Sequence, residues 1–211
     1  MKKSLLLICI CLTLTACSKK DQESSLISIN GKAYKTVRIG KQTWTASNYD
    51  GPGGIASARN DEGAIGKFYR IDEINNIPLP SGWRIPTRSD FNLLLSSQGS
   101  LVVNNDTYSR LGDQFTGHLR ATSGWNINGD NLSGFNAFAA GYEQTGIFYA
   151  SGISTYFWSS TPGPGVGDAT QFVLNLKVVP GNDQLSGQFA VTYTDPIADS
   201  SGYSLRFVKD N

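Results

Sequence analysis

Aromatic side chains in the second half of the chain are the residues best suited to binding a ligand. Tyr149 follows Phe148, and Tyr156 opens the aromatic run 156–158 a few residues later. An exposed aromatic ring can stack on the apolar face of a sugar, but side chains of a strand alternate between the two faces of a sheet, so half of these rings must point inward. We take Tyr149 and Tyr156 as candidate ligand-binding residues and expect Trp158 in the core.

Two aspartates complete the candidate site. Asp168 ends the long Gly/Pro-rich loop 161–168, and Asp183 lies further along the chain. Binding residues are common in such loops. A glycoside hydrolase would instead need two carboxylates in one cleft, about 5–10 Å apart. The carboxylates follow no pattern that pairs them, at Asp50, Asp61, Glu62, Asp130, Glu143, Asp168, Asp183 and Asp195.

The segment 126–131 superficially resembles an oxygen-rich calcium loop. It lacks the regular ligand spacing and the terminal Glu of an EF-hand, so turn formation explains it better, and calcium binding stays open as the alternative. His118 is the single histidine, so zinc is disfavoured, and a catalytic base would need a nucleophile and an orienting partner in reach. We expect His118 to be structural or on the surface, with a Ser–His–Asp arrangement as the alternative. We expect no catalytic residue, cofactor or metal ion.

The three cysteines all lie in the first 17 residues, which indicates that they belong to a targeting signal and not to the folded domain. Lys2 and Lys3 precede an apolar run from Leu5 to Leu14, about half of the roughly 20 residues that span a bilayer. This order is that of a secretory signal peptide, and Cys17 directly after small residues makes it resemble a bacterial lipoprotein lipobox. The resemblance implies a signal peptide over 1–16 and lipidation of Cys17, with an ordinary signal peptide as the alternative.

Residues 17–26 are predicted to form a flexible tether, because they are polar and show no apolar period. Lys20 and Asp21, with Glu23 nearby, faintly resemble the export signal of surface lipoproteins, so we expect an outer-membrane lipoprotein exposed at the cell surface; a solvated charge run is the alternative. Loss of the leader leaves 16 of the 18 basic side chains against 17 acidic ones, a formal charge of −1. This balance argues against nucleic acid as a partner.

The segment 80–91 is the element around which we expect the domain to form. Thr87 is a good helix N-cap, and Asp90 is placed to bond back to it as in a capping box. Apolar residues then recur at helical spacing over 91–95. The pattern predicts a short helix after Thr87, with Trp83 packed beside its apolar stripe.

Most other segments predict short strands joined by turns. Asn30-Gly31 is a strong hairpin signal between 26–30 and 32–39, and Gly40-Lys41 leads into a strand at 42–46. From residue 124 onward the pattern is that of strands. Further strands are predicted at 138–142, 146–149, 155–160, 171–179, 188–193 and 203–208, a short helix at 68–74, and an ambiguous helical pattern at 106–115.

Eight short motifs follow one another in the chain after the tether. They are 42–48 (QTWTASN), 66–69 (GKFY), 80–87 (PSGWRIPT), 124–126 (GWN), 134–137 (GFNA), 141–142 (GY), 156–161 (YFWSST) and 206–210 (RFVKD). In this order the chain resembles the Fibrobacter succinogenes major paralogous domain, which is similar in turn to C-type-lectin-like folds and to the formylglycine-generating group. The resemblance implies one α+β, C-type-lectin-like domain over 27–211, with mostly short antiparallel strands and two or three short helices.

This chain departs from the family at two cysteine positions. The family usually has a cysteine just before Pro-Ser-Gly-Trp and another in its closing Arg-Cys-Val-Lys-Asp, where Leu79 and Phe207 stand here. Both are absent together, as expected if they form one disulfide in the family. We hypothesise that Leu79 and Phe207 touch in the core, where burial would contribute about 1.5–3 kcal/mol for each. Formylglycine generation depends on cysteines and is therefore not expected.

We expect a lipid-anchored envelope protein whose domain binds a glycan or protein partner at the cell surface without catalysis. The membrane, reached through Cys17, is the other expected partner. This expectation is an analogy of fold, which does not determine function. The first alternative is a structural or fimbrial assembly subunit, and a carboxylate-dependent hydrolase ranks last.

Overall fold

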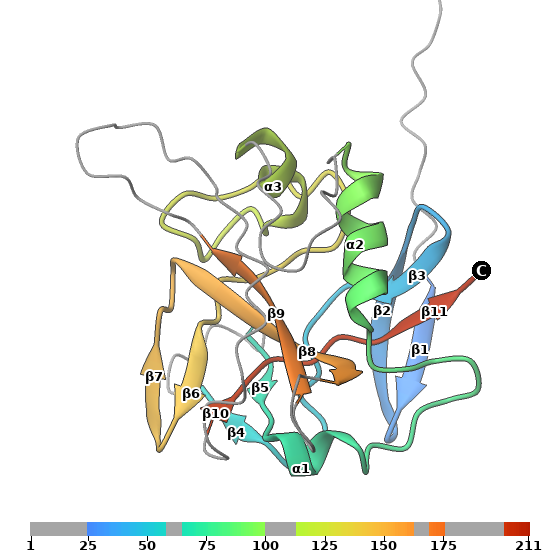
Figure 1. Ribbon diagram of the computed structural model, residues 1–211, viewed down its shortest axis with the longest axis vertical. Coiled ribbons are helices and arrows are strands. Elements are labelled where there is room, and N and C mark those ends of the chain that lie inside the picture. Colours follow the sequence, from blue (N-terminus) through green and yellow to red (C-terminus); the bar gives the residue numbers. More distant parts are fainter. Residues whose placement is uncertain (1–24, 58–64, 100–112, 163–168, 176–200) are drawn as a thin grey trace, which may run out of the picture.

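The computed structural model describes residues 25–57, 65–99, 113–162, 169–175 and 201–211. They form an α+β fold of short antiparallel strands and three short helices, as predicted (Figure 1). The sheets have the strand orders β1-β2-β3-β11, β10-β6-β7, β4-β5 and β8-β9. In chain order the elements are β1 (Leu26–Ile29), β2 (Lys32–Ile39), β3 (Gln42–Thr45), β4 (Ile55–Ala56), β5 (Lys67–Phe68), α1 (Ile71–Ile74), α2 (Arg88–Ser97), α3 (Asp113–Leu119), β6 (Tyr142–Gln144), β7 (Ile147–Tyr149), β8 (Ser154–Pro162), β9 (Ala169–Asn175), β10 (Ser201–Gly202) and β11 (Val208–Asp210).

The first three strands form where the turn chemistry predicts them. Asn30 and Gly31 have φ values of 49° and 76°, as a two-residue turn of type I′ requires, and the register pairs Ile29 with Lys32. Gly40, with φ 59°, turns the chain from β2 into β3. These two tight turns set the register of the β1-β2-β3 sheet.

The C-terminal segment, residues 201–211, joins the separate sheets. β10 pairs with β6, Tyr203 bridges Tyr69, Val208 bridges Arg84, and β11 pairs with β3. Figure 1 shows this red segment crossing the molecule from β6 to β3. The prediction of one continuous strand at 203–208 is wrong, because the chain changes partner repeatedly and only its two ends form strands. Residues 201–208 are all buried.

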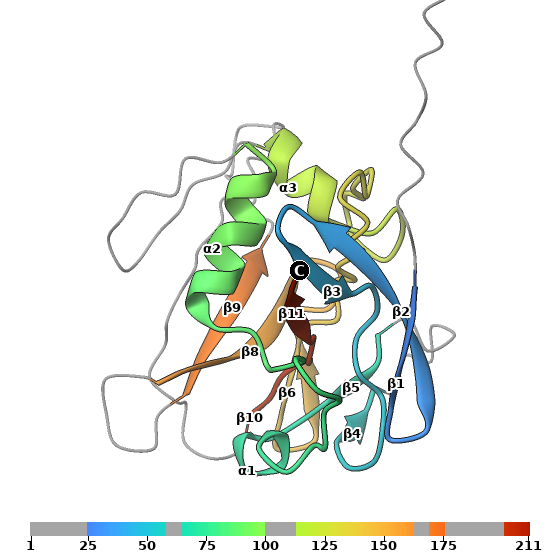
Figure 2. The same ribbon diagram turned by 90° about the vertical axis from the view of Figure 1, so that its right-hand side faces the viewer.

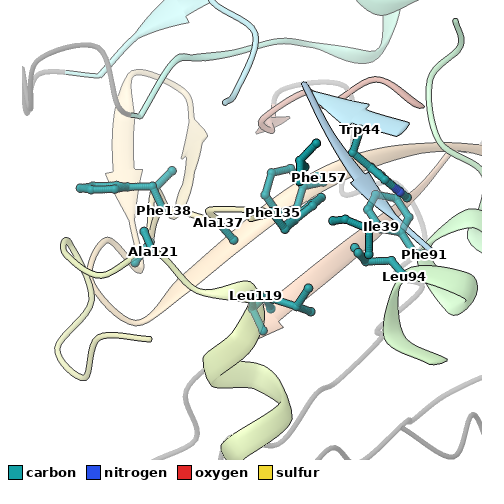
Figure 3. Packing of buried hydrophobic residues seen from close by; sticks show 14 of the residues in the cluster. Ile39, Trp44, Phe91, Leu94, Leu119, Ala121, Phe135, Ala137, Phe138 and Phe157 are labelled. Atoms are coloured by element: carbon teal, nitrogen blue, oxygen red, sulfur yellow. The ribbon is translucent and has the colours of Figure 1, made fainter. Parts of the chain in front are cut away.

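Two hydrophobic clusters fill the fold. The larger one surrounds Trp44, whose ring centroid lies 5.4 Å from that of Phe91 on α2 and 5.5 Å from that of Phe135 (Figure 3). The second contains Tyr34, Tyr69, Trp158, Tyr203 and Phe207 among others. Strand alternation explains the division, since β2 and β8 each contribute residues to both clusters.

Arg206 is a fully buried cation, only 1% exposed. Its guanidinium lies 4.8 Å from the ring centroid of Phe135 and donates hydrogen bonds to Asn48 Oδ1 and to the carbonyls of Thr45, Phe135 and Asn136. Burial lowers the pKa of Arg206 to about 9, so the side chain is still charged at neutral pH. Its bonds tie the segment 135–136 to the end of β3.

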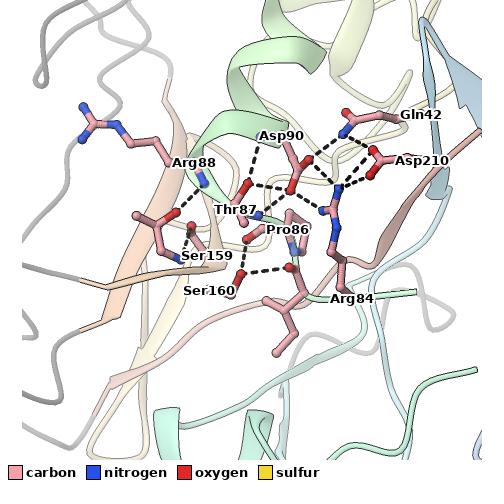
Figure 4. Close-up of polar contacts among 11 residues, drawn as sticks. Gln42, Arg84, Pro86, Thr87, Arg88, Asp90, Ser159, Ser160 and Asp210 are labelled. Carbon is pink, nitrogen blue, oxygen red and sulfur yellow. Dashed lines mark hydrogen bonds and ion pairs between the residues drawn. The ribbon is translucent and has the colours of Figure 1, made fainter. Parts of the chain in front are cut away.

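Helix α2 begins as predicted, with Thr87 as N-cap. Thr87 Oγ1 accepts a hydrogen bond from Asp90 N, and the Asp90 carboxylate accepts one from Thr87 N at 2.7 Å, which completes a capping box. Arg84 and Gln42 also donate to Asp90, and both reach Asp210 on β11 (Figure 4). We refer to Gln42, Arg84, Thr87, Asp90 and Asp210 as the Arg84–Asp90 clamp.

Hydrogen bonds outweigh burial in the clamp. Burial alone would raise the pKa of Asp90, but bonds from Arg84, Thr87 and Gln42 hold it below its ordinary value. Bonds from Arg84 and then Gln42 lower the pKa of Asp210. Burial alone would lower the pKa of Arg84, but both carboxylates raise it. Arg84, Asp90 and Asp210 are therefore all charged at neutral pH.

Trp83 does not pack beside the apolar stripe of α2, so that prediction is wrong. It lies half-buried against the second cluster, and the Lys209 ammonium is 5.5 Å from its ring centroid. Arg84 pairs with Val208 in an extended bridge, and its side chain turns towards Asp90. Trp83 and Ile85 flank Arg84 in the chain. Strand alternation therefore places both on the opposite face, where they pack against the second cluster.

Leu79 and Phe207 lie in one region, as the hypothesis about the missing cysteines requires. Phe207 is fully buried in the second cluster, and Leu79 packs half-buried against the same cluster. The ring of Phe207 meets that of Tyr49 edge-on, with centroids 5.3 Å apart. Both positions are thus packed in the second cluster, and a direct contact between Leu79 and Phe207 stays a prediction.

Other predicted boundaries shift for identifiable reasons. The strand at 138–142 is wrong except for Tyr142, and Gly141 only bridges Thr155. The helix at 68–74 begins at Ile71, because Lys67 and Phe68 pair with β4. β9 covers 169–175, and α3 begins at Asp113. The rest of 171–179, most of 106–115 and all of 188–193 lie outside the described residues.

Candidate binding site

β6 and β7 form a hairpin at one side of the molecule (Figure 1). Its turn, Thr145-Gly146, has φ values of 51° and 84°, again the geometry of type I′. The sheet order places β7 at an edge, with β6 as its single partner among the described strands. The register sets Tyr142 opposite Tyr149 and Gln144 opposite Ile147, all on one face of the hairpin.

These four side chains form what we term the tyrosine face, with Tyr156 of β8 at its border. Tyr142 and Tyr149 stack, with centroids 5.2 Å apart and planes inclined by 21°. Tyr156 meets Tyr142 edge-on at 5.0 Å. Ile147 is 54% exposed and Tyr149 38%. The face therefore offers solvent an aromatic and apolar surface with one amide, that of Gln144, and no charged side chain.

Buried aromatic rings support Tyr156 from behind. Tyr156 stacks on Tyr203 at 5.6 Å, and Trp158 meets Tyr203 edge-on at 4.7 Å. The Trp158 indole donates to Tyr69 O at 2.7 Å, so its predicted place in the core is confirmed. Burial raises the pKa of both Tyr156 and Tyr203, so their hydroxyls are neutral at physiological pH.

The inward side of the hairpin holds its one charged residue. Glu143 is fully buried, and its carboxylate lies 3.2 Å from Arg70 Nη2 and accepts the Gly146 N–H in the turn. Gly141, with φ 73°, precedes Tyr142; a Cβ there would lie 1.9 Å from Tyr149 O. Glu143 and Gly141 therefore determine how the two stacked tyrosines are presented.

The structure brings together two of the four residues predicted for the site. Tyr149 and Tyr156 both contact Tyr142, whereas Asp168 and Asp183 lie outside the described residues. Sequence reasoning missed Tyr142 and Gln144 because it placed a strand end at residue 142. The Gly141-Tyr142 motif and the two-residue spacing from Tyr142 to Gln144 were the available signals.

Two carboxylates share one site in the described part of the chain, in the Arg84–Asp90 clamp. Arg84 Nη2 lies 2.9 Å from Asp90 Oδ1 and 2.9 Å from Asp210 Oδ2. A glycosidase needs a general acid whose pKa is raised, but the pKa of each carboxyl is lowered here. The clamp consequently serves the fold and does not supply hydrolase chemistry.

The segment 126–131 uses its side-chain oxygens to make turns. Asn128 Oδ1 accepts Trp125 N, and Asp130 Oδ1 accepts Leu132 N, both at 3.1 Å. These bonds support turn formation over calcium binding. His118 Nε2 lies 3.8 Å from Asp130 Oδ2 and is partly exposed. Within the described ranges, no three His, Cys, Asp or Glu side chains are grouped as metal ligands.

All but one of the residues that build the face and the clamp lie within one family match. The model of the Fibrobacter succinogenes major domain matches residues 37–209. The chain belongs to this family. The Fibrobacter succinogenes major domain thus includes every residue named above for the tyrosine face and all of the clamp except Asp210. Comparisons with curated proteins and with solved structures found no match. No helix in the described residues is both long and apolar enough to cross a membrane.

Proposed function

We propose that the chain is a lipid-anchored outer-membrane protein whose domain binds a glycan or protein partner at the cell surface without catalysis. The observation that carries the proposal is the tyrosine face. Tyr149, which stacks on Tyr142, and the neighbouring Ile147 are both exposed on a short hairpin. Exposed apolar patches on soluble domains mark interaction sites. The lowered pKa values of Asp90 and Asp210 argue against a glycosidase site in the Arg84–Asp90 clamp.

The position of the tyrosine face suits a tethered binding domain. β1, which follows the proposed tether, and the β6–β7 hairpin lie at opposite sides of the molecule (Figure 1). A lipid on Cys17 would hold the chain near the membrane from the β1 side, leaving the hairpin directed elsewhere. At least two acyl chains are needed for stable anchoring, and a lipoprotein N-terminus provides them.

We infer further that the fold is C-type-lectin-like. The inference rests on the similarity of the family to that fold and is supported by the α+β arrangement of short antiparallel strands with three short helices. Such folds place binding residues on connections held by a rigid scaffold. The fold alone does not determine the ligand.

Two experiments test the proposal on the full chain. Mass spectrometry should find a diacylglyceryl thioether on Cys17, and Cys17→Ser should move the protein from the membrane fraction to the soluble fraction. An unmodified Cys17 would contradict the anchor. The native protein should also capture a glycan or a surface protein, and Tyr149→Ala should weaken capture. Assembly into a polymer of copies, without any such ligand, would instead support the structural subunit.

A further inference from the structure

The tyrosine face points to one class of ligand. We propose that it is a binding site for a neutral glycan built of hexopyranose units, with Tyr149 as the stacking platform and Gln144 as the polar contact. This inference rests on the proposed function and specifies its ligand.

The first argument is the geometry of the rings. One face of the Tyr149 ring is stacked on Tyr142 at 5.2 Å, while the side chain remains 38% exposed on an edge strand. A ligand can therefore reach the exposed part of the Tyr149 side chain. A pyranose offers a flat patch of C–H groups of about the same size as a phenol ring, and an aromatic face, which carries the negative part of the ring quadrupole, attracts such C–H groups.

The second argument is charge. Tyr142, Gln144, Ile147 and Tyr149 are all neutral, and the charged residue of the hairpin, Glu143, is buried against Arg70 on the other side. A ligand carrying carboxylates or sulfates would find no cation to pair with among the four described side chains of the face. The Gln144 amide supplies both donors and an acceptor, which suits neighbouring hydroxyl groups. Apolar surface with a few placed polar groups is typical of small-ligand sites.

The third argument is preorganisation. Glu143 accepts the Gly146 N–H and so fixes the hairpin turn, while Gly141 allows Tyr149 O to pack where a side chain would otherwise lie. Ala150, directly after Tyr149, has φ 56°, an uncommon backbone conformation for a non-glycine residue. A rigid platform lowers the ordering cost of binding, which matters for weak, hydroxyl-rich ligands.

The test measures glycan affinity with the full-length chain, purified in a detergent without a sugar headgroup. The probes are cellotetraose, mannotetraose and galactotetraose as neutral glycans, with tetragalacturonate as the charged comparison. We expect at least one neutral probe to bind and tetragalacturonate not to bind. Tyr149→Ala should lower the affinity by about tenfold or more, and Gln144→Ala by about threefold to tenfold.

Two variants serve as controls. Tyr149→Phe retains the ring and should keep the affinity within about threefold. Leu132→Ala removes a side chain that is 68% exposed outside the hairpin, so it should change nothing. Each variant is compared with the wild type by thermal unfolding, so that a loss of binding is not mistaken for a loss of fold.

A measurement on the unmodified chain keeps the test independent of any variant. Saturation of aromatic protons should transfer to the C–H protons of the bound neutral tetrasaccharide. Lack of binding by every neutral probe, equal affinity in Tyr149→Ala, or lack of such transfer overturns the inference. If the wild type captures a surface protein but no glycan, this inference fails while the proposed function stands. If it captures neither, both fail.

Discussion

The Arg84–Asp90 clamp and the tyrosine face use their side chains in opposite ways. In the clamp, Asp90 receives bonds from Gln42, Arg84 and Thr87, and Arg84 also holds Asp210. In the hairpin, the buried Glu143 satisfies the turn, while Tyr149 and Ile147 remain exposed. Polar groups that are bonded to one another within the fold leave little for a ligand, whereas the exposed side chains of the tyrosine face can still contact one. The contrast teaches which region maintains the fold and which is open to a partner.

Removing the central carboxylate of the clamp should have the largest effect. Asp90→Ala leaves Arg84 facing Asp210 alone and removes the bond from Thr87 N that completes the capping box of α2, so we expect the free energy of unfolding to fall by about 3 kcal/mol. Chemical denaturation measures this change. Asp72→Ala, which removes an exposed acidic side chain in the first turn of α1, is the matched control and should cost under about 0.5 kcal/mol. A similar cost for both variants would show that the clamp does not stabilise the fold.

Gly141→Ala should cost about 2 kcal/mol or more, because the new Cβ would lie 1.9 Å from Tyr149 O in a left-handed backbone conformation. Gly31→Ala has the same backbone problem, with φ 76°, but open space around the new Cβ, so it should cost only about 1 kcal/mol. The difference between the two variants in chemical denaturation isolates the steric clash. Glycan binding should also be weaker in Gly141→Ala and unchanged in Gly31→Ala. An equal loss of unfolding free energy in the two variants would contradict this account of the hairpin.

Acid should weaken the clamp. The folded pKa of Asp90 lies below its ordinary value of 3.8, so the unfolded state binds more protons than the folded state in the range between the two. The stabilisation is therefore complete above this range and is lost as pH falls through the folded pKa. Denaturation at pH 7, 5, 4 and 3 should show a shallower decline for Asp90→Asn than for the wild type. Parallel curves would refute this role of Asp90.

Tyr149→Ala should have the smallest effect on stability. The side chain is 38% exposed on an edge strand and loses its ring contact with Tyr142, so we expect a change of about 0.5 kcal/mol in the free energy of unfolding. Trp158→Ala, which removes a buried ring from the layer behind, should cost about 3 kcal/mol or more. A large cost for Tyr149→Ala would mean that the ring belongs to the core and is not kept for a ligand.

Local chemistry made the capping box of α2 and the first hairpin predictable. Thr87 and Asp90 stand at the spacing of a capping box, and Asn30-Gly31 suits only a few turn geometries, so both features follow from neighbouring residues. The partners of Asp90 could not be predicted in the same way, because Gln42 and Asp210 are 48 and 120 positions away in the chain. The central course of 201–208 was missed for the same reason.

The tyrosine face was predicted only in part. Alternation required half of the rings to point inward, and the structure places Phe148 and Phe157 in the larger cluster, but alternation said nothing about which strands would be neighbours. Thr145 adopts φ 51° without the usual Asn or Asp, so the turn that brings Tyr142 opposite Tyr149 carried a weak sequence signal. The buried Glu143 stabilises that turn through Gly146, a contact that depends on the completed fold.

Hydrogen exchange on the full-length chain, with and without a saturating neutral tetrasaccharide, tests the division between the two regions most directly. The account predicts slower exchange of amides in 142–150 when the glycan is bound and unchanged exchange in α2 and around Arg84. Protection confined to α2, β2 or the clamp, with none in the β6–β7 hairpin, would contradict it.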